Sequence, residues 1–171
     1  MTRIAAVLAV AALGSGCGYH VSGRADMLPK TIKTIAVPAW GNVTTRYKLA
    51  EALPADITRE FISRTRYTIV AEPERADAVL AGAVVNQFAY PAVADPASGR
   101  ATGMLVVVYL QVTLTERSTG AVLFTRPSME VRERYEISVD PKAYFDESET
   151  AMQRLSRDVA RSVVSAILEQ F

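Results

Sequence analysis

The sequence predicts an α+β fold: a two-layer sandwich in which two helices pack on one face of a mixed four-stranded sheet. Two segments repeat apolar residues at helical spacing on one side only, so each can cover a sheet with that side. Segments rich in β-branched residues precede the first of these and separate the two, so the predicted order is strand, helix, three long strands, helix. With 50% hydrophobic and 22% charged residues, the composition is that of a globular chain.

The N-terminus has the anatomy of a lipoprotein signal peptide over residues 1–16. Arg3 provides a positive start, Ile4–Leu13 is apolar, and small residues lead directly to Cys17. A membrane span takes about 20 apolar residues, so this segment is too short to be one. We expect cleavage before Cys17, acylation of its thiol, and a lipidated tether over residues 17–30 that anchors the chain to a membrane.

An ordinary signal peptide with an incidental free cysteine is the alternative, because Gly14 stands where a lipobox prefers leucine. Lipidation nevertheless explains the single cysteine of an exported chain, which cannot form an internal disulfide. Gly18 follows Cys17, in place of the aspartate that resembles an inner-membrane retention signal. The outer membrane, facing the periplasm, is therefore the expected location.

Residues 31–171 are expected to form one domain, whose strands are recognised by β-branched and alternating residues. The predicted strands are Thr31–Val37, Ala76–Tyr90, Met104–Glu116 and Ala121–Ile137, with a short strand-like segment at Tyr67–Val70. Turns or loops are predicted at Trp40–Thr45, Pro91–Gly103 and Ser118–Gly120. Pro127 lies inside the last strand, which should therefore be an edge strand or carry a bulge.

Two helices complete the predicted domain. The first spans Arg46–Arg64, and Pro54 should make it irregular between Ala50 and Pro54. The second is expected to start at Asp146, as N-cap of a capping box with Glu149, and to run to the end of the chain. Their apolar stripes are Leu49, Leu53, Ile57 and Phe61 in the first, and Met152, Leu155, Val159, Val163 and Ile167 in the second.

Residues that could carry catalysis are scarce. His20 is the only histidine and lies in the tether, and Cys17 is expected to be acylated, so no Ser-His-Asp or Cys-His arrangement can form. No metal-binding spacing or phosphate-binding glycine loop is present. A helix start explains the acidic residues of 146–149. We expect no enzyme activity, cofactor or metal, and the net charge of +1 argues against nucleic acid.

Surface arginines are the remaining candidates for ligand binding. Arg126, Arg132 and Arg134 share one parity on the last strand and should face one way if the strand is regular, although a bulge at Pro127 would shift Arg126. A guanidinium matches phosphate oxygens in two-point geometry, so these residues and Arg100 are candidate phosphate contacts. A solvated sheet face with neighbouring glutamates is the alternative. Tyr109 alternates with polar residues, which suits a partner surface.

The segment that follows the predicted signal peptide, CGYHVSG over residues 17–23, is similar to the opening of a known family. By this start the chain resembles the LptE family of lipopolysaccharide-assembly outer-membrane lipoproteins, and weaker similarities follow in order through nearly the whole mature chain. They include Leu28-Pro29, Ile32–Pro38, Asn42, Phe61, Arg66-Tyr67, Ala76-Asp77, Leu80–Gly82, Thr119-Gly120, Val122-Leu123 and the helix around Ala151, Leu155 and Asp158–Ala160.

The resemblance implies two helices on a four-stranded sheet, and a function. Such a lipoprotein plugs the large β-barrel of the lipopolysaccharide translocon (an LptD-type partner), helps that barrel to assemble, and binds lipopolysaccharide. The alternative is a periplasm-facing lipoprotein that regulates a cell-wall synthase or forms a curli-type secretion component. Those proteins share the IAV-type opening strand found at residues 35–37 but lack the CGY start.

Overall fold

The computed structural model describes residues 28–96, 99–136 and 141–170, with the side chains of all these except Tyr135 and residues 141–149. Cys17, His20 and the signal peptide lie outside the described residues, so cleavage and lipidation remain predictions. The elements are β1 (Thr34–Ala36), β2 (Gly41–Asn42), α2 (Lys48–Arg64), β3 (Thr68–Val70), the 3-10 turn η1 (Pro73–Arg75), β4 (Ala78–Ala94), β5 (Ala101–Glu116), β6 (Val122–Glu136) and α3 (Pro141–Leu168).

The sheet is mixed, as predicted, but it has six strands and not four. Its order is β3-β1-β4-β5-β6, with β2 beside β4. The short strands β1, β2 and β3 pair in parallel, and β4, β5 and β6 form the predicted antiparallel meander. The two strands that the prediction did not count, β2 and β3, have two and three residues, too few to show an alternating pattern.

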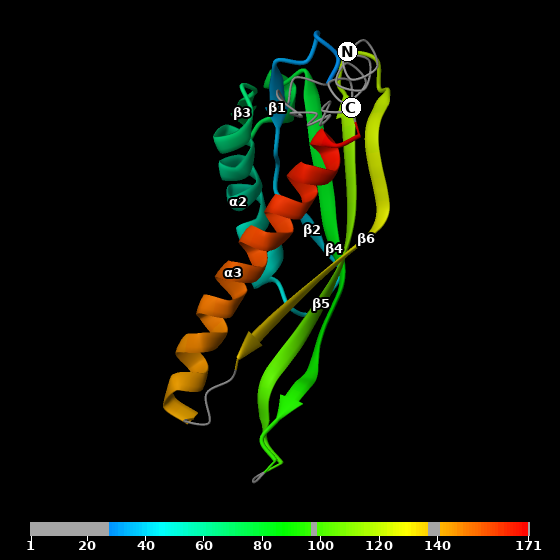
Figure 1. Cartoon of the computed structure of the whole chain (residues 1–171). Coiled ribbons are helices and arrows are strands. Elements are labelled where there is room, and N and C mark those ends of the chain that lie inside the picture. The colour runs from blue at the N-terminus through cyan, green and yellow to red at the C-terminus, as the bar shows by residue number, and fades with distance from the viewer. Residues whose placement is uncertain (1–27, 97–98, 137–140, 171) are drawn as a thin grey trace, which may run out of the picture.

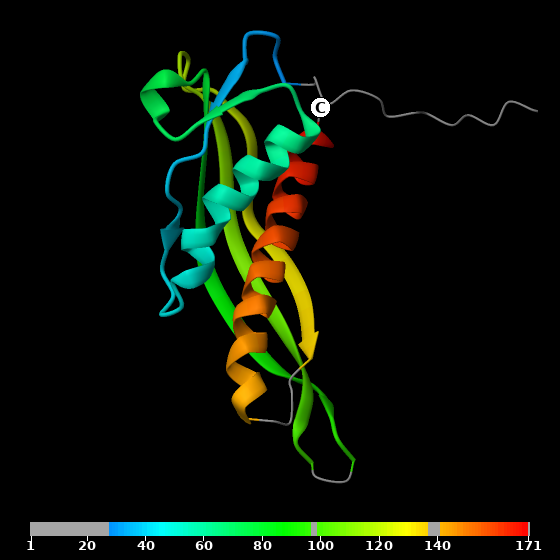
Figure 2. The same ribbon diagram turned by 90° about the vertical axis from the view of Figure 1, so that its left-hand side faces the viewer.

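Both helices cover the same face of the sheet, and they lie side by side in Figures 1 and 2. The other face carries no helix among the described residues. The predicted stripe of α2 is completely buried, and from Leu155 onward so is the stripe of α3. Against them pack the even-numbered residues of β5, namely Val106, Val108, Leu110, Val112 and Leu114.

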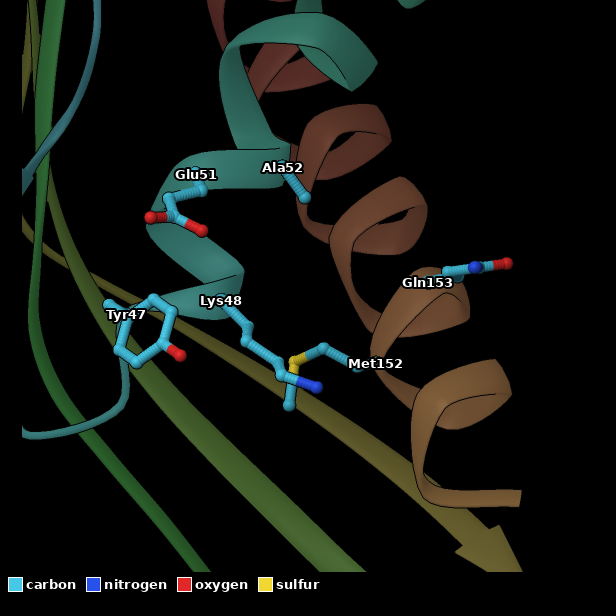
Figure 3. A pocket seen from close by; sticks show the side chains of 6 residues that line it. All are labelled: Tyr47, Lys48, Glu51, Ala52, Met152 and Gln153. Atoms are coloured by element: carbon cyan, nitrogen blue, oxygen red, sulfur yellow. The ribbon is translucent and has the colours of Figure 1, made fainter. Parts of the chain in front are cut away.

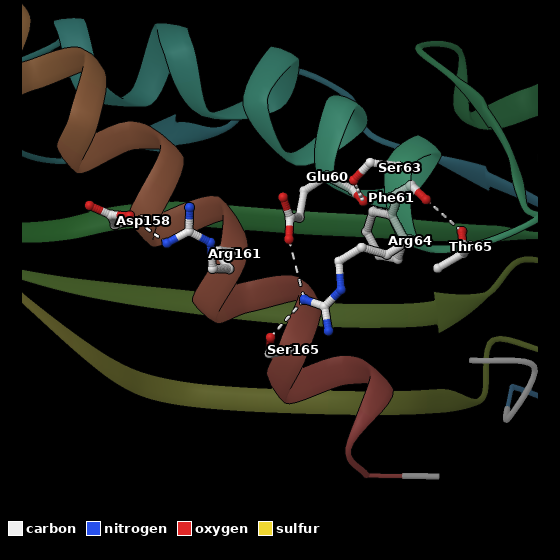
Figure 4. A network of polar contacts seen from close by, with 8 residues as sticks. All are labelled: Glu60, Phe61, Ser63, Arg64, Thr65, Asp158, Arg161 and Ser165. Carbon is white, nitrogen blue, oxygen red and sulfur yellow. Dashed lines mark hydrogen bonds and ion pairs between the residues drawn. The ribbon is translucent and has the colours of Figure 1, made fainter. Parts of the chain in front are cut away.

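Polar contacts join the two helices along their length. Ser156 is fully buried, and its hydroxyl donates to the Asp56 carboxylate over 2.5 Å. Nearer the end of α2, Arg64 donates to Ser165 over 2.7 Å and to Glu60 over 3.3 Å (Figure 4). The contacts to Ser156 and Ser165 join the two helices at the middle and at the C-terminal end of α2.

The boundaries of both helices differ from the prediction. α2 is one helix that includes Pro54, as expected, but it begins at Lys48 and not at Arg46, and it is continuous through Ala50–Pro54, where irregularity was predicted. α3, however, begins at Pro141, so Asp146 lies inside the helix and is not its N-cap. Proline is favoured in the first turn because its missing N–H would have no helical partner there, which is why a residue that suggested a loop instead starts the helix.

Two contacts hold residues 28–42 against the rest of the fold. Leu28, which the sequence analysis assigns to the tether, is only 4% exposed and packs into the core. The ring of Trp40 lies flat on Gly82 of β4, where an added Cβ would come within 2.6 Å of Trp40 Cε2. Only glycine leaves room for the indole, and this contact holds β2 and its flanking loop against β4.

Candidate functional site

The uncovered face of the sheet carries a compact group of aromatic and arginine side chains. Three rows cross β4, β5 and β6 on this face, each made of residues paired in register. We call these nine residues the open-face patch: Asn86, Tyr109 and Glu130 in the first row, Phe88, Val107 and Arg132 in the second, and Tyr90, Leu105 and Arg134 in the third.

The centre of the patch is apolar. Phe88 and Tyr109 meet edge to face, with ring centroids 5.7 Å apart. Val107 is only 3% exposed although no helix covers this face, because its in-register neighbours flank it on both sides. Phe88 and Tyr90 are 41% and 44% exposed, and because they are next to each other on one face they form a contiguous exposed apolar area. The β4 side of the patch is thus aromatic and accessible.

The β6 side of the patch is charged and hydrogen-bonded. Arg132 donates through Nε to the Glu130 carboxylate. This contact, together with a hydrogen bond from the Tyr109 hydroxyl, lowers the pKa of Glu130. The same Glu130 hydrogen bond raises the pKa of Tyr109. Arg134 makes no ion pair with any described residue, so it is the guanidinium available to an anion.

Arg126 does not share this face. The pairing with β5 shifts between Met129, opposite Leu110, and Arg126, opposite Val112, so β6 has one extra residue at Pro127 and Ser128. This bulge turns Arg126 to the helix side, where its guanidinium lies over the Phe124 ring, 5.1 Å from the centroid. Only Arg132 and Arg134 therefore face one way, because the bulge at Pro127 shifts Arg126, as predicted for a strand that is not regular; the predictions of an edge strand and of a bulge at Pro127 are both confirmed.

Arg100 lies apart from the other arginines, in the loop between β4 and β5. Backbone hydrogen bonds close this loop between Asp95 N and Arg100 O and between Gly99 N and Asp95 O, both 2.8 Å long. The loop is the tip of a hairpin that projects beyond the helices, away from the end where the tether enters (Figures 1 and 2). Arg100 and the open-face patch are therefore separate places on the molecule.

A groove lies between the two helices, apart from the open-face patch. It has a volume of about 380 Å³ and is lined by Tyr47, Lys48, Glu51 and Ala52 at the start of α2 and by Met152 and Gln153 of α3 (Figure 3). A smaller cavity of about 150 Å³ adjoins it at Tyr47 and Glu51 and reaches Trp40. The linings contain one carboxylate and one ammonium but no histidine or cysteine.

Comparison with known proteins identifies the family. The model of the LptE family, described as lipopolysaccharide-assembly, matches residues 32–167, most of the chain. The chain belongs to the LptE family. The predicted resemblance is thus confirmed, and with it the lipopolysaccharide-assembly theme at family level. None of the curated proteins matches the chain.

Solved structures similar to this LptE-family chain include several lipoproteins. Lipoprotein B from Nitrosomonas europaea shares 16% identity at a TM-score of 0.55, over 90% of this chain and 96% of the other. Rare lipoprotein B from Shewanella oneidensis shares 12%, at 0.51, over 80% and 95%. PelC from Paraburkholderia phytofirmans, a dodecamer, shares 15%, at 0.51, over 81% and 89%. At these identities the likeness shows the fold alone.

Among the described residues, neither α2 nor α3 is long and apolar enough to cross a membrane. Arg132, Arg134 and Tyr109 were predicted as surface candidates, whereas Phe88 and Tyr90 were missed. Their alternation in the sequence was visible. What the sequence did not reveal is that β4 pairs with β5 in the register that sets these two rings beside Tyr109.

Proposed function

We propose that this protein is a non-enzymatic, lipid-anchored protein of the outer membrane that plugs the β-barrel lipopolysaccharide translocon, helps that barrel to assemble, and binds lipopolysaccharide on its way to the cell surface. Membership in the LptE family supports the lipopolysaccharide-assembly role. The observation that carries the proposal on this chain is the open-face patch, an exposed aromatic and arginine surface on a sheet face without a helix.

Such a surface suits a protein partner. Tyrosine, phenylalanine and arginine are enriched at the centres of protein interfaces, where they combine large contact area with few flexible bonds. Phe88 and Tyr90 provide that area, and the Tyr109–Glu130–Arg132 chain of hydrogen bonds provides fixed polar groups beside it. A barrel interior that contacts this face would remove the exposed rings from water.

The same surface suits an amphipathic phosphate-bearing lipid. Arg134 makes no ion pair with a described residue, and Arg132 points from the same face two residues away. Charge-assisted hydrogen bonds to phosphate are the strong class of such contacts. The apolar side chains of the neighbouring strands would lie under acyl chains. Arg100 at the hairpin tip is a further candidate contact, and it remains a prediction.

Co-purification tests the partner. The lipidated chain, isolated from detergent-solubilised outer membranes, should bring a large β-barrel of the LptD type with it. Recovery of a cell-wall synthase or a secretion-pore component in place of the barrel would move the protein to the alternative class of lipoprotein regulators.

A double variant tests the glycolipid contact. Arg132→Ala with Arg134→Ala should bind lipopolysaccharide about tenfold more weakly or worse, since two charge-assisted contacts are lost. The barrel should still be recovered, because the larger contact area of Phe88 and Tyr90 is unchanged. Arg126→Ala is the matched control, because this arginine of the same strand lies on the other face. Equal binding by the wild type and the double variant would mean that the arginine pair is only a solvated surface.

A further inference from the structure

One edge of the sheet is left open over half of β4. On its outer side β4 pairs with β1 at Ala78 and Val79 and with β2 at Ala83 and Val84, and the last backbone bond there runs from Val43 N to Val84 O over 3.1 Å. From residue 85 to residue 94 no described strand lies beyond it. The same residues are exposed from Asn86 on, apart from Gln87 and Ala89, whose side chains turn to the helix side.

The open edge of β4 has no protection by charge. All 17 residues of β4 are uncharged, whereas six of the 15 residues of β6, at the other edge of the sheet, are charged. Soluble proteins commonly place charged side chains on a free edge because its unpaired backbone groups otherwise invite another strand. The β6 edge follows this rule and the β4 edge does not. The β6 edge is therefore protected by charge against pairing with another strand, and the β4 edge is not.

The backbone donors of this edge can be assigned. The Gln87 N–H donates to the side chain of the preceding residue, Asn86 Oδ1, over 2.9 Å, and so it points away from β5. Along an antiparallel strand the outward-facing groups alternate, which places the Ala89 N–H outward too. Pro91, next in that series, has no N–H to offer. Between Asn86 and Pro91 two N–H groups therefore point outward, of which that of Gln87 is held by Asn86 Oδ1 in the free chain, and Pro91 ends the stretch that another strand could follow.

The occupant must cover more than the edge. A strand laid along about five residues buries far less than the roughly 1,200 Å² of the smallest stable interfaces. The exposed rings of Phe88 and Tyr90 belong to the same strand and supply the missing area. A second copy joined edge to edge would continue the sheet and leave both patches uncovered, so it fits poorly. A different protein that adds a strand and also covers the patch fits both observations.

We infer that the edge of β4 between Asn86 and Tyr90 pairs with an extended, uncharged segment of the partner protein. When this segment is paired, the rest of the partner lies over Phe88 and Tyr90. This inference rests on the proposed function, which makes that partner the barrel protein. The wall of a closed barrel has no free edge. The pairing segment therefore comes from outside the closed wall, such as a loop or terminal extension.

Hydrogen exchange of the full lipidated chain, alone and in the co-purified barrel complex in detergent, tests the inference. In the complex, the Gln87 and Ala89 amides should exchange at least about tenfold more slowly than in the free chain, because they gain a strand partner. The amides of the β6 edge, measured in the same sample, are the internal control for general protection. Asn86→Ala should speed exchange at Gln87 in the free chain only, since the complex replaces the lost side-chain bond.

The outcomes separate the two ideas. A complex that forms while Gln87 and Ala89 exchange as in the free chain overturns the inference and leaves the proposed function standing. Failure to recover the barrel at all overturns the proposed function. Protection that rises with the concentration of the free chain would identify a second copy as the occupant and would also overturn the inference.

Discussion

At the scale of single residues, several positions that carry the family resemblance hold the fold together. Asp77 is the clearest example. Its carboxylate accepts hydrogen bonds from the backbone N–H groups of Lys33 and Thr34, each over 2.9 Å. Its backbone N–H donates to the Thr34 carbonyl, and its carbonyl accepts from the Arg117 N–H. One side chain thus joins the start of β1, the start of β4 and the turn after β5. Resemblance at such a residue reports the fold and not a ligand site.

The hydrogen bonds to Asp77 predict a pH dependence of stability. The two backbone donors lower the pKa of its carboxyl below the usual value, so its stabilising effect is present above the ordinary aspartate pKa and is lost as the pH falls through the lowered one. Asp77→Ala should lower the free energy of unfolding by about 1–2 kcal/mol at pH 7. Urea denaturation should show that the difference from wild type shrinks at pH 3.

Glu74→Ala is the control for this experiment, because Glu74 is an exposed acid three residues away with no bond to a described residue. It should change stability little at either pH. An Asp77→Ala deficit that is as large at pH 3 as at pH 7 would contradict the assigned role of the charged carboxylate.

At the scale of elements, periodic segments were predictable and contact-dependent ones were not. The stripes of both helices and the alternation of β5 were visible because many residues repeat one period. β2 was predicted to be a turn, since its two residues become a strand only through the packing of Trp40 on Gly82. Strands β4 and β5 also extend into the predicted Pro91–Gly103 loop, because an outward-facing proline on an edge loses no ladder bond.

Pro54 provides a test at the same scale. It lies inside α2, so the backbone bond that its N–H would make to the Ala50 carbonyl is missing. Pro54→Ala restores this donor and should raise the free energy of unfolding by about 1–3 kcal/mol. Thermal and urea unfolding measure the effect, with Ala55→Gly, at the next and exposed position, expected to lower stability by about 1 kcal/mol. A loss of stability in Pro54→Ala would mean that the proline ring, which lines the cavity beside Trp40, is needed for packing.

The candidate site was predictable only in part, for a similar reason. Parity along one strand suggested Arg132 and Arg134, and these two do share a face. The position of Arg126 depended on whether Pro127 produced a bulge, and the aromatic half of the patch depended on the register between two strands. Neither is encoded in a local pattern, because register is set by the turn and by burial of one face.

At the scale of the whole molecule, the end where the described chain begins and the β4–β5 hairpin lie opposite each other. The domain is entered at the end where Leu28 is buried, and the β4–β5 hairpin projects from the other end (Figure 1). Cys17 and Leu28 are eleven residues apart, which even fully extended spans at most about 40 Å. A lipid on Cys17 would therefore keep the buried entry end near the membrane surface and leave the hairpin with Arg100 farther away.

Removal of the lipid should separate anchoring from folding. Cys17→Ser should be released from membranes by washing in a strain that lacks the barrel partner, because no acyl chain remains. Its urea midpoint, measured on the purified chain, should match that of the lipidated protein, since the core begins at Leu28. Wild type from the same strain is the control and should stay with the membrane; retention of both proteins would contradict a lipid anchor at Cys17.

The packing of Trp40 on Gly82 also gives the protein a spectroscopic handle. The chain has a single tryptophan, and its indole is 7% exposed against the strand whose far end carries Phe88 and Tyr90. Fluorescence excited at the indole band therefore comes from one known place. Its emission reports whether β2 is seated on β4 without any label, so unfolding and occupancy of the neighbouring groove can be followed in the same cuvette.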